Sequence, residues 1–283
     1  ARAGLDTVVI EKMGAGGQMS LTDTIDNYPG FDEGIDGFTL GMRMQKSAER
    51  FGASTLYGEI KSVDLTDRIK CAETEKEIYR ARAVIISTGA DPRELGLNKE
   101  RDFIGKGIHY CAHCDGRFYK DKTVMVVGGG NTAAADALYL ARFAKKVYLV
   151  HRRDTLRAEK ILRDPLLKAE NVEFLWNSTP VRLLGNERIE GVELQNLKTN
   201  ESKAISADGI FISIGRKPAT QFLDGALKLD ESGYIIADET TKTNIDGVFA
   251  VGDVRTKPLR QIVTAVGDGA VAVHFAEEYL ANL

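Results

Sequence analysis

The stretch KTVMVVGGGNTAAADALYLARFAKKVYLVH, residues 122–151, carries the strongest fold signal in the sequence. An apolar run rich in valine, 122–127, leads into a glycine-rich turn. The next stretch, 131–143, is rich in alanine and leucine at helical spacing, and a second apolar run follows at 146–150. A strand, a glycine turn, a helix and a second strand in this order predict a parallel βαβ unit of an α/β fold.

The small residues of the turn have the spacing of a dinucleotide fingerprint. Gly128, Gly130 and Ala133 match the pattern Gly-x-Gly-x-x-Gly/Ala. The first glycine allows a tight turn, the second lets the backbone approach a pyrophosphate, and the small third residue lets the helix pack closely on the strand. Asn131 and Thr132 open the helix, where free N–H groups face a phosphate. We therefore predict that these five residues bind a dinucleotide.

The end of the second strand indicates which dinucleotide is bound. An NAD site carries Asp or Glu there, which binds the ribose 2′-hydroxyl. This sequence instead has His151, Arg152 and Arg153, with Arg157 nearby. Guanidinium groups suit a dianionic 2′-phosphate. We therefore predict NADPH rather than NADH; the alternative is a solvated basic turn without a ligand.

A second nucleotide pattern stands at the start of the chain. Residues 7–10 read as a strand, and Glu11 follows at the place of an acid that binds an adenosine ribose. The matching glycine fingerprint is expected about 20 residues upstream, ahead of Ala1. We therefore expect the first strand and phosphate loop of this second site to be missing from the chain. Taken alone, Glu11 is better explained as a surface acid at a strand end.

Composition limits the function classes. A chain of 283 residues has room for two domains. Its net charge of −3 predicts no attraction to nucleic acid or to an anionic membrane. The sequence lacks both an apolar run of about 18 residues and a secretory signal, so we expect a cytoplasmic protein.

Cys111 and Cys114 form a Cys-x-x-Cys pair just before the fingerprint. In a cytoplasmic protein such a pair is more often catalytic or metal-binding than structural. No second Cys-x-x-Cys or paired histidines complete a set of four zinc ligands, so we predict no metal site. Cys71 lies in a charged stretch and is expected to be an ordinary surface cysteine.

Several motifs in a fixed order add a family resemblance. CAHCDG (111–116), HRRDTLRAEK (151–160), TNIDGVFAVGDV (243–254) and RQIVTAVGDGA (260–270) are similar to segments of the low-molecular-weight, bacterial-type thioredoxin reductases. EKMGAGGQM (11–19), NYPG (27–30) and STGADPRELG (87–96) resemble the flavin-domain segments of the same family. The resemblance covers essentially the whole chain from the first strand onward.

The resemblance implies two Rossmann-like, three-layer ββα domains. Residues 1–93 and 221–283 would form a discontinuous FAD-binding domain, and residues 94–220 an inserted NADPH-binding domain that carries the cysteines. The positive end of the final helix would lie near the flavin and stabilise its reduced, anionic form. The residues implied in FAD binding are Glu11, Gly16, Gly17, Gln18, Asn27, Thr88, Gly89, Gly252, Asp253, Arg260, Gln261 and Ile262.

The resemblance also implies a reaction. NADPH would reduce FAD, FAD would reduce a Cys111–Cys114 disulfide, and the dithiol would reduce thioredoxin or a similar small dithiol protein. Cys114 would face the flavin, Cys111 would attack the partner, and Asp115 would act as general acid. A homodimer is expected. The alternatives are a reductase of a peroxiredoxin, a non-enzymatic NADPH-binding redox sensor and a zinc-binding module.

His113 between the cysteines is similar to the flavoprotein subunit of alkyl hydroperoxide reductase rather than to many thioredoxin reductases. We hypothesise that a protonated His113 lowers the pKa of Cys111, because positive charge favours the thiolate. The alternative is that His113 is only a tolerated exposed residue.

Overall fold

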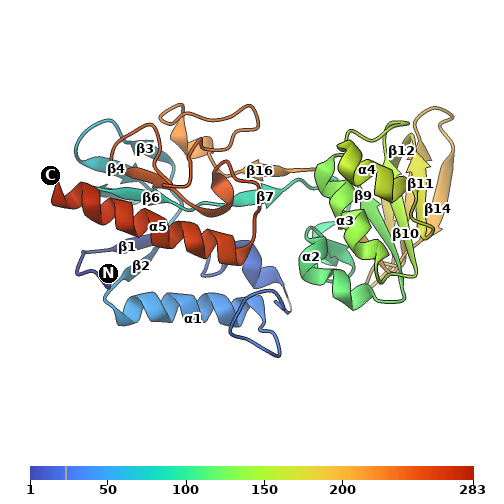
Figure 1. Ribbon diagram of the computed structural model, residues 1–283, viewed down its shortest axis with the longest axis horizontal. Helices are drawn as coiled ribbons and strands as arrows, with labels where there is room; N and C mark the ends of the chain where they lie inside the picture. Colours follow the sequence, from blue (N-terminus) through green and yellow to red (C-terminus); the bar gives the residue numbers. More distant parts are fainter. Residues whose placement is uncertain (23) are drawn as a thin grey trace. The chain divides into compact units, whose positions relative to one another are not determined.

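Two units make up the chain in the computed structural model, which describes residues 1–22 and 24–283. Unit 1 comprises residues 1–21, 28–91 and 217–283, and unit 2 comprises residues 22–27 and 92–216. The chain passes between the units along β7 (Ala90–Pro92) and β16 (Arg216–Pro218), which pair as a two-stranded sheet (Figure 1). Unit 2 is therefore an insertion into unit 1.

Unit 2 is built on a five-stranded sheet in the order β11-β10-β9-β15-β8. Its strands are β8 (Ile108–His109), β9 (Thr123–Val127), β10 (Lys146–His151), β11 (Val172–Trp176) and β15 (Gly209–Ile212). Every neighbouring pair is parallel. The predicted α/β class with parallel sheets is thus confirmed, because the βαβ pattern of residues 122–151 lies at the centre of this sheet.

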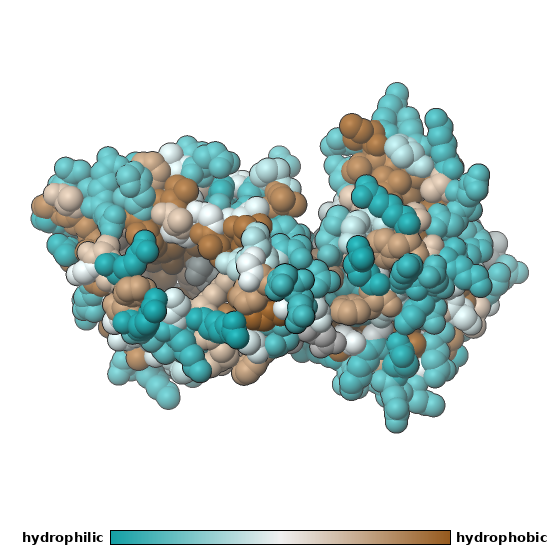
Figure 2. Space-filling view, turned by 60° about the horizontal axis from the view of Figure 1, so that its bottom comes forward, coloured by the Kyte–Doolittle hydropathy of each residue, from teal (hydrophilic) through white to brown (hydrophobic). Residues whose placement is uncertain are grey.

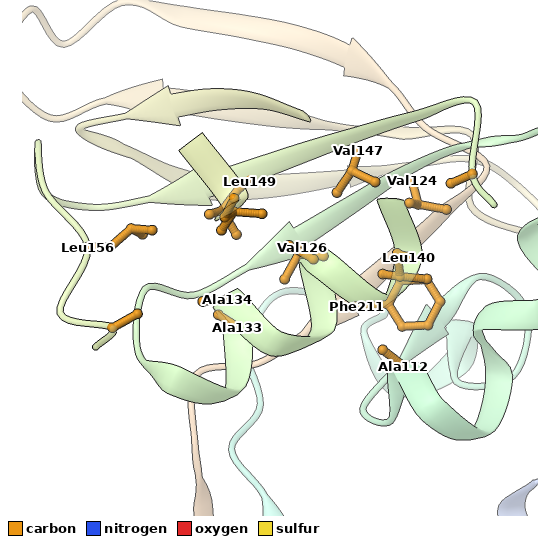
Figure 3. Close-up of a cluster of buried hydrophobic side chains, with 14 of the residues drawn as sticks. Ala112, Val124, Val126, Ala133, Ala134, Leu140, Val147, Leu149, Leu156 and Phe211 are labelled. Atoms are coloured by element: carbon orange, nitrogen blue, oxygen red, sulfur yellow. The ribbon is translucent and has the colours of Figure 1, made fainter. Parts of the chain in front are cut away.

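Residues of β9 alternate between two apolar cores, one on each face of the sheet. Val124 and Val126 belong to one cluster with residues of α3 (Asn131–Ala141) and α4 (Lys160–Leu167). Figure 3 shows them with Ala133, Ala134 and Leu140 of α3. Met125 and Val127 belong to the core on the opposite face. A strand buried on both faces is expected to be apolar throughout rather than alternating, which explains the sequence TVMVV.

The opposite face of the sheet is covered by a second, antiparallel sheet. It contains β12 (Ser178–Leu184), β13 (Gly191–Asn196) and β14 (Ser202–Ser206). Val192 and Leu194 of β13 and Ile205 of β14 join Met125 in one core. Unit 2 therefore has three layers, namely helices, a parallel sheet and an antiparallel sheet, as the family resemblance implies.

Unit 1 holds three smaller sheets. β1 (Val8–Glu11) pairs in parallel with β2 (Ser54–Tyr57), and β6 (Val84–Ile86) pairs in parallel with β17 (Val248–Ala250). β3 (Ser62–Asp64), β4 (Lys70–Glu73) and β5 (Ile78–Ala81) form an antiparallel sheet. On the face drawn in Figure 2, apolar residues surround a hollow in the left-hand body, which is unit 1.

Two long helices flank these sheets (Figure 1). The first, α1 (Gly37–Arg50), begins where the Asp36 side chain accepts a hydrogen bond of 2.8 Å from the Thr39 N–H. The second, α5 (Ile262–Ala281), begins with a capping box between Gln261 and Thr264. The shorter helical turns are η1 (Gly17–Leu21), η2 (Arg101–Phe103), α2 (Ala112–Asp115), η3 (Gly116–Tyr119), η4 (Gln221–Leu223) and η5 (Gly252–Val254).

Candidate active site

The two cysteines of the Cys-x-x-Cys pair are joined in a disulfide. Cys111 and Cys114 have an S–S distance of 2.09 Å and a Cα–Cα distance of 5.3 Å. Cys111 occupies the N-cap of the short helix α2, and Asp115 is the last residue of that helix. The predicted redox disulfide is therefore present, and both sulfurs belong to partly buried residues.

Residues around the pair form a polar network and aromatic contacts. Asp115 Oδ2 lies 2.9 Å from Nδ1 of His109, whose Nε2 lies 2.7 Å from the Tyr119 hydroxyl. His113 is exposed, and its ring centroid lies 4.2 Å from that of Tyr139. The effect of His113 on Cys111 stays a prediction.

The glycine turn between β9 and α3 is shaped by close contacts. A Cβ at Gly128 would lie 2.4 Å from the Ser213 carbonyl oxygen, and a Cβ at Gly129 would lie 2.1 Å from a ring carbon of His151. A Cβ at Gly130 would meet no heavy atom within 4 Å. The backbone at the start of α3 is therefore open, as close approach of a phosphate to a helix N-terminus requires.

The residues that open α3 are divided between its surface and its core. Asn131 and Thr132 are exposed, and Ala133 is fully buried. The Asn131 side chain donates to Glu159 Oε1 at 2.9 Å and accepts from the Glu159 N–H at 2.9 Å. These two hydrogen bonds hold Glu159, which follows the basic cluster, against the N-terminus of α3.

The basic cluster splits into one buried histidine and three exposed arginines. His151 is 5% exposed, and its Nε2 has no hydrogen-bond partner within the described part of the chain. Burial lowers the pKa of His151, and the neighbouring arginines lower it further. The exposed guanidinium groups are those of Arg152, Arg153 and Arg157. Positive charge for an anion therefore comes from the arginines, while His151 packs beneath the turn.

In unit 1, the predicted FAD residues lie on turns at strand ends and at the start of α5. Glu11 ends β1 and accepts a hydrogen bond of 3.2 Å from the Met13 N–H. Gln18 donates to the Ala90 carbonyl at 2.6 Å, and the Thr88 hydroxyl donates to the Ala219 carbonyl at 2.7 Å. Gly16, Gly17 and Gly89 all have positive φ. Asn27 belongs to the segment 22–27, which groups with unit 2.

Two further FAD candidates, Gly252 and Asp253, lie on a turn that is bound to a buried ion cluster. The Gly252 N–H donates to Asp268 Oδ2 at 2.8 Å, and Arg255 donates to both oxygens of Asp268. Asp253 directly follows Gly252 in η5. Burial raises the pKa of Asp268, but hydrogen bonds from Arg255 and Lys257 outweigh that effect and lower it to about 2. The cluster ties the turn of Asp253 to α5.

The start of α5 also carries candidate residues. The guanidinium carbon of Arg260 lies 4.1 Å from the centroid of the Tyr234 ring. Gln261 caps the helix and Ile262 is its first residue. A helix of 20 residues offers a positive dipole end at this point.

Sequence reasoning missed three polar residues near these sites. His109 and Tyr119 form the network with Asp115, and both are buried. Asp136 on α3 is 7% exposed and accepts a hydrogen bond of 2.5 Å from the Ser213 hydroxyl. A histidine two residues before the cysteine pair and an acid within an apolar helix were the available signals.

Neither a metal-ligand cluster nor a membrane-spanning helix is found among the described residues. Within residues 1–22 and 24–283, no group of three or more His, Cys, Asp or Glu side chains is placed to hold a metal ion. Over the same residues, every helix is too short or too polar to cross a membrane. Cys71 is a free, partly buried cysteine.

Comparison with known proteins assigns the family. The model of the pyridine nucleotide-disulphide oxidoreductases matches residues 1–269. The chain belongs to this family. It is 44% identical over 286 residues to a thioredoxin reductase of Peptoclostridium acidaminophilum, covering 99% of this chain and 91% of that relative. A thioredoxin reductase of Listeria monocytogenes is also 44% identical, covering 100% of this chain and 89% of that relative.

Solved structures of pyridine nucleotide-disulphide oxidoreductases agree with this assignment. The thioredoxin reductase of Streptococcus pyogenes superposes with a TM-score of 0.91 at 43% identity, covering 100% of this chain and 92% of that chain. The thioredoxin reductase from Giardia duodenalis superposes with a TM-score of 0.90 at 36% identity, covering 99% and 92%. The fold and the family resemblance predicted from the sequence are therefore confirmed.

Proposed function

We propose that this protein is a thioredoxin-disulfide reductase, which takes electrons from NADPH and reduces the disulfide of thioredoxin or a similar small dithiol protein. The observation that carries the proposal is the Cys111–Cys114 disulfide, placed in the same unit as the Gly128–Gly130 turn. Full-length relatives at 44% identity bear the name thioredoxin reductase, which supports the same activity.

The NADPH-binding domain of this proposal comprises residues 94–220. The open backbone at Gly130 supports a pyrophosphate there, next to Asn131 and Thr132. The exposed guanidinium groups of Arg152, Arg153 and Arg157 support a 2′-phosphate. His151, also proposed for this site, lies buried beneath the turn, where burial lowers its pKa.

The FAD-binding domain of this proposal comprises residues 1–93 and 221–283. Glu11 would bind the adenosine ribose, and Asp253 would bind the ribityl or pyrophosphate region. The N-terminus of α5, with Arg260 and Gln261, would lie near the flavin ring. The remaining residues proposed to bind FAD are Gly16, Gly17, Gln18, Asn27, Thr88, Gly89, Gly252 and Ile262. When bound, FAD supplies a two-electron carrier between NADPH and the disulfide.

The protein's own chemistry is thiol–disulfide exchange. In the reduced enzyme, Cys111 gives its thiol proton to the Asp115 carboxylate and attacks the partner disulfide as a thiolate, forming a mixed disulfide and releasing one partner sulfur as a thiolate. Asp115 gives that thiolate its proton. Cys114 then attacks Cys111, which restores the disulfide and releases the second partner thiol. Two electrons and two protons pass to the partner in one cycle.

The proposal includes a homodimer in the cytoplasm, which follows the family resemblance. Sedimentation equilibrium of the flavin-loaded protein measures the oligomeric state directly. A mass close to twice 31.0 kDa is expected, and a mass that stays at 31.0 kDa at every concentration would exclude the dimer.

Trapping the mixed disulfide tests the proposed function. Reduced Cys114→Ser protein is mixed with a thioredoxin that lacks its own resolving cysteine and carries its remaining cysteine as a mixed disulfide with 2-nitro-5-thiobenzoate, which leaves when Cys111 attacks. A covalent one-to-one complex through Cys111 is expected, because no second thiol can release the partner. The matched Cys111→Ser protein should give no such complex. A complex with a peroxiredoxin but none with thioredoxin would move the substrate to that class.

A further inference from the structure

A buried chain of three polar side chains lies beside the cysteine helix. His109 is 8% exposed and Tyr119 is 4% exposed. His109 Nδ1 lies 2.9 Å from Asp115 Oδ2, and His109 Nε2 lies 2.7 Å from the Tyr119 hydroxyl. Both ring nitrogens of the histidine therefore have partners, and the chain ends at the carboxylate that follows Cys114.

The backbone and the aromatic neighbours fix this arrangement. His109 and Phe211 are paired residues of neighbouring strands, and their rings stack with centroids 5.2 Å apart. The Tyr119 ring meets both at an edge, with centroid distances of 5.3 and 5.4 Å. A Cβ at Gly209 would lie 2.4 Å from a Tyr119 ring carbon, so only glycine leaves room for the tyrosine. The imidazole is thus held on its faces as well as at its nitrogens.

The hydrogen bonds of this network decide which ring nitrogen of His109 carries the proton. Burial raises the pKa of Tyr119 to about 12, so its hydroxyl keeps its proton at neutral pH. Within the described residues, that hydroxyl has the imidazole as its recorded partner. A neutral ring with the proton on Nδ1 accepts from Tyr119 and donates to Asp115, which satisfies all three groups. A proton on Nε2 would leave the buried tyrosine proton without an acceptor.

We propose that His109 and Tyr119 are positioning residues: Tyr119 orients the His109 ring, and His109 binds one oxygen of Asp115 and leaves its other oxygen to exchange protons with the Cys111–Cys114 pair. This inference rests on the proposed function of Asp115. The free oxygen takes the proton of the attacking Cys111 thiol as the mixed disulfide forms. It then gives the same proton to the partner sulfur that leaves, so Asp115 ends the step as it began.

The donor from His109 stabilises the carboxylate form of Asp115, because a hydrogen bond to a charged acceptor favours the charged state. Without that donor, a larger fraction of Asp115 would already carry a proton at a given acidic pH, and a protonated Asp115 cannot take the proton of Cys111. The rate of dithiol exchange would then begin to fall at a higher pH on the acidic side.

Two amide substitutions of His109 distinguish the loss of its hydrogen bond to Asp115 from the loss of its packing. In His109→Asn the amide nitrogen stands near the place of Nδ1 and can still donate to Asp115. In His109→Gln the amide reaches the place of Nε2 and leaves Asp115 without the donor. Tyr119→Phe removes only the hydroxyl, and His274→Asn on the exposed part of α5 is the matched control.

The experiment measures dithiol exchange without FAD or NADPH. Each protein is reduced with dithiothreitol, freed of reductant and mixed with 5,5′-dithiobis(2-nitrobenzoate) between pH 5 and 8. The acidic limb of the rate profile should move up by about one pH unit in His109→Gln and stay close to the wild-type position in His109→Asn. Tyr119→Phe should move it less, in the same direction. Equal profiles for the asparagine and glutamine variants would overturn the proposal.

Nitrogen-15 NMR of histidine-labelled wild-type protein gives an independent result, even if a variant fails to fold. A neutral His109 ring with its proton on Nδ1 is expected at pH 7. A proton on Nε2 alone, or on both nitrogens, would contradict the proposed network. Because neither measurement uses a cofactor, they can succeed when NADPH-driven turnover fails. The failure of the proposed function is thereby distinguishable from the failure of this inference.

Discussion

β9 in unit 2 and β1 in unit 1 are both short parallel strands that end beside candidate nucleotide-binding residues. Val124, Met125 and Val126 of β9 are 0% exposed, whereas Val8 and Val9 of β1 are 47% and 45% exposed. β9 has β10 and β15 on its two sides, while the recorded partner of β1 among the described residues is β2. Both apolar sequences therefore form strands. The number of neighbouring strands decides how deeply their side chains are buried.

The two units also stabilise their binding turns by different physical means. In unit 2 the turn is held by shape, because Gly128 and Gly129 approach Ser213 and His151 too closely for any side chain. In unit 1 the turn at Gly252 is held by charge, through the buried Asp268 carboxylate. The units should accordingly respond to different kinds of substitution.

The largest expected effect is on the charge-held turn of unit 1. Asp268→Asn leaves Arg255 and Lys257 buried without their anion, so the free energy of unfolding should fall by roughly 3–5 kcal/mol. Urea unfolding measures the loss. Glu59→Gln is the matched control, because Glu59 also binds two cations, Lys12 and Lys61, but on the surface. A loss for Asp268→Asn no greater than for Glu59→Gln would remove the distinction between the units.

The same carboxylate predicts a pH dependence with a definite sign. The pKa of Asp268 is lowered to about 2 in the folded protein, below about 3.9 for an unfolded aspartate. Its contribution to stability is therefore complete above about pH 4 and is lost as the pH falls through about 2. Acid unfolding of Asp268→Asn should be flatter than that of the wild type over this window. Parallel curves would show that the carboxylate is not responsible.

A matched pair of core truncations tests the difference in burial. Leu149→Ala removes a fully buried side chain of β10 and should lower the free energy of unfolding by about 2–5 kcal/mol. Val9→Ala removes a side chain that is 45% exposed, so the loss should stay under about 1 kcal/mol. Chemical denaturation of both variants gives the comparison. Similar losses would mean that β1 is as well covered as β10.

Substitutions of the neighbouring Gly129 and Gly130 give the smallest expected change in stability. They also distinguish most clearly an effect on stability from an effect on NADPH binding. Gly129→Ala forces a methyl group onto the His151 ring and should cost about 1–3 kcal/mol of stability. Gly130→Ala meets no atom within 4 Å, so stability should change little while affinity for NADPH falls, because the methyl group occupies the phosphate approach. Thermal unfolding and NADPH titration separate the two. Unchanged NADPH affinity in Gly130→Ala would place the pyrophosphate elsewhere.

Sequence patterns predicted most of unit 2 because its signals are local. The helix expected at residues 131–143 is observed as α3 over Asn131–Ala141, and the strand expected at 146–150 is β10 over Lys146–His151. The Cys111–Cys114 disulfide also lies within four residues of chain. Contacts between residues far apart in the sequence were not predicted. Phe211 stacks on His109 because β15 and β8 pair in parallel, and Ser213 binds Asp136 because α3 lies beside the end of β15.

The basic cluster shows a second limit of sequence reasoning. His151 and the arginines of residues 152–157 look alike as charged residues at a strand end. The structure separates them, because the strand alternation turns His151 inward beneath Gly129 and leaves the arginines exposed. Side-chain direction at the last residue of a strand depends on register, which the sequence pattern specifies only to within a residue or two.

The central claim is that electrons from NADPH leave the protein through Cys111 and Cys114. The most direct test follows NADPH absorbance in the flavin-loaded protein with thioredoxin and insulin, and compares NADPH with NADH. Thioredoxin-dependent oxidation of NADPH is expected, with little oxidation of NADH and none in Cys111→Ser. Thioredoxin reduction that persists in Cys111→Ser, or that uses NADH equally well, would contradict the account.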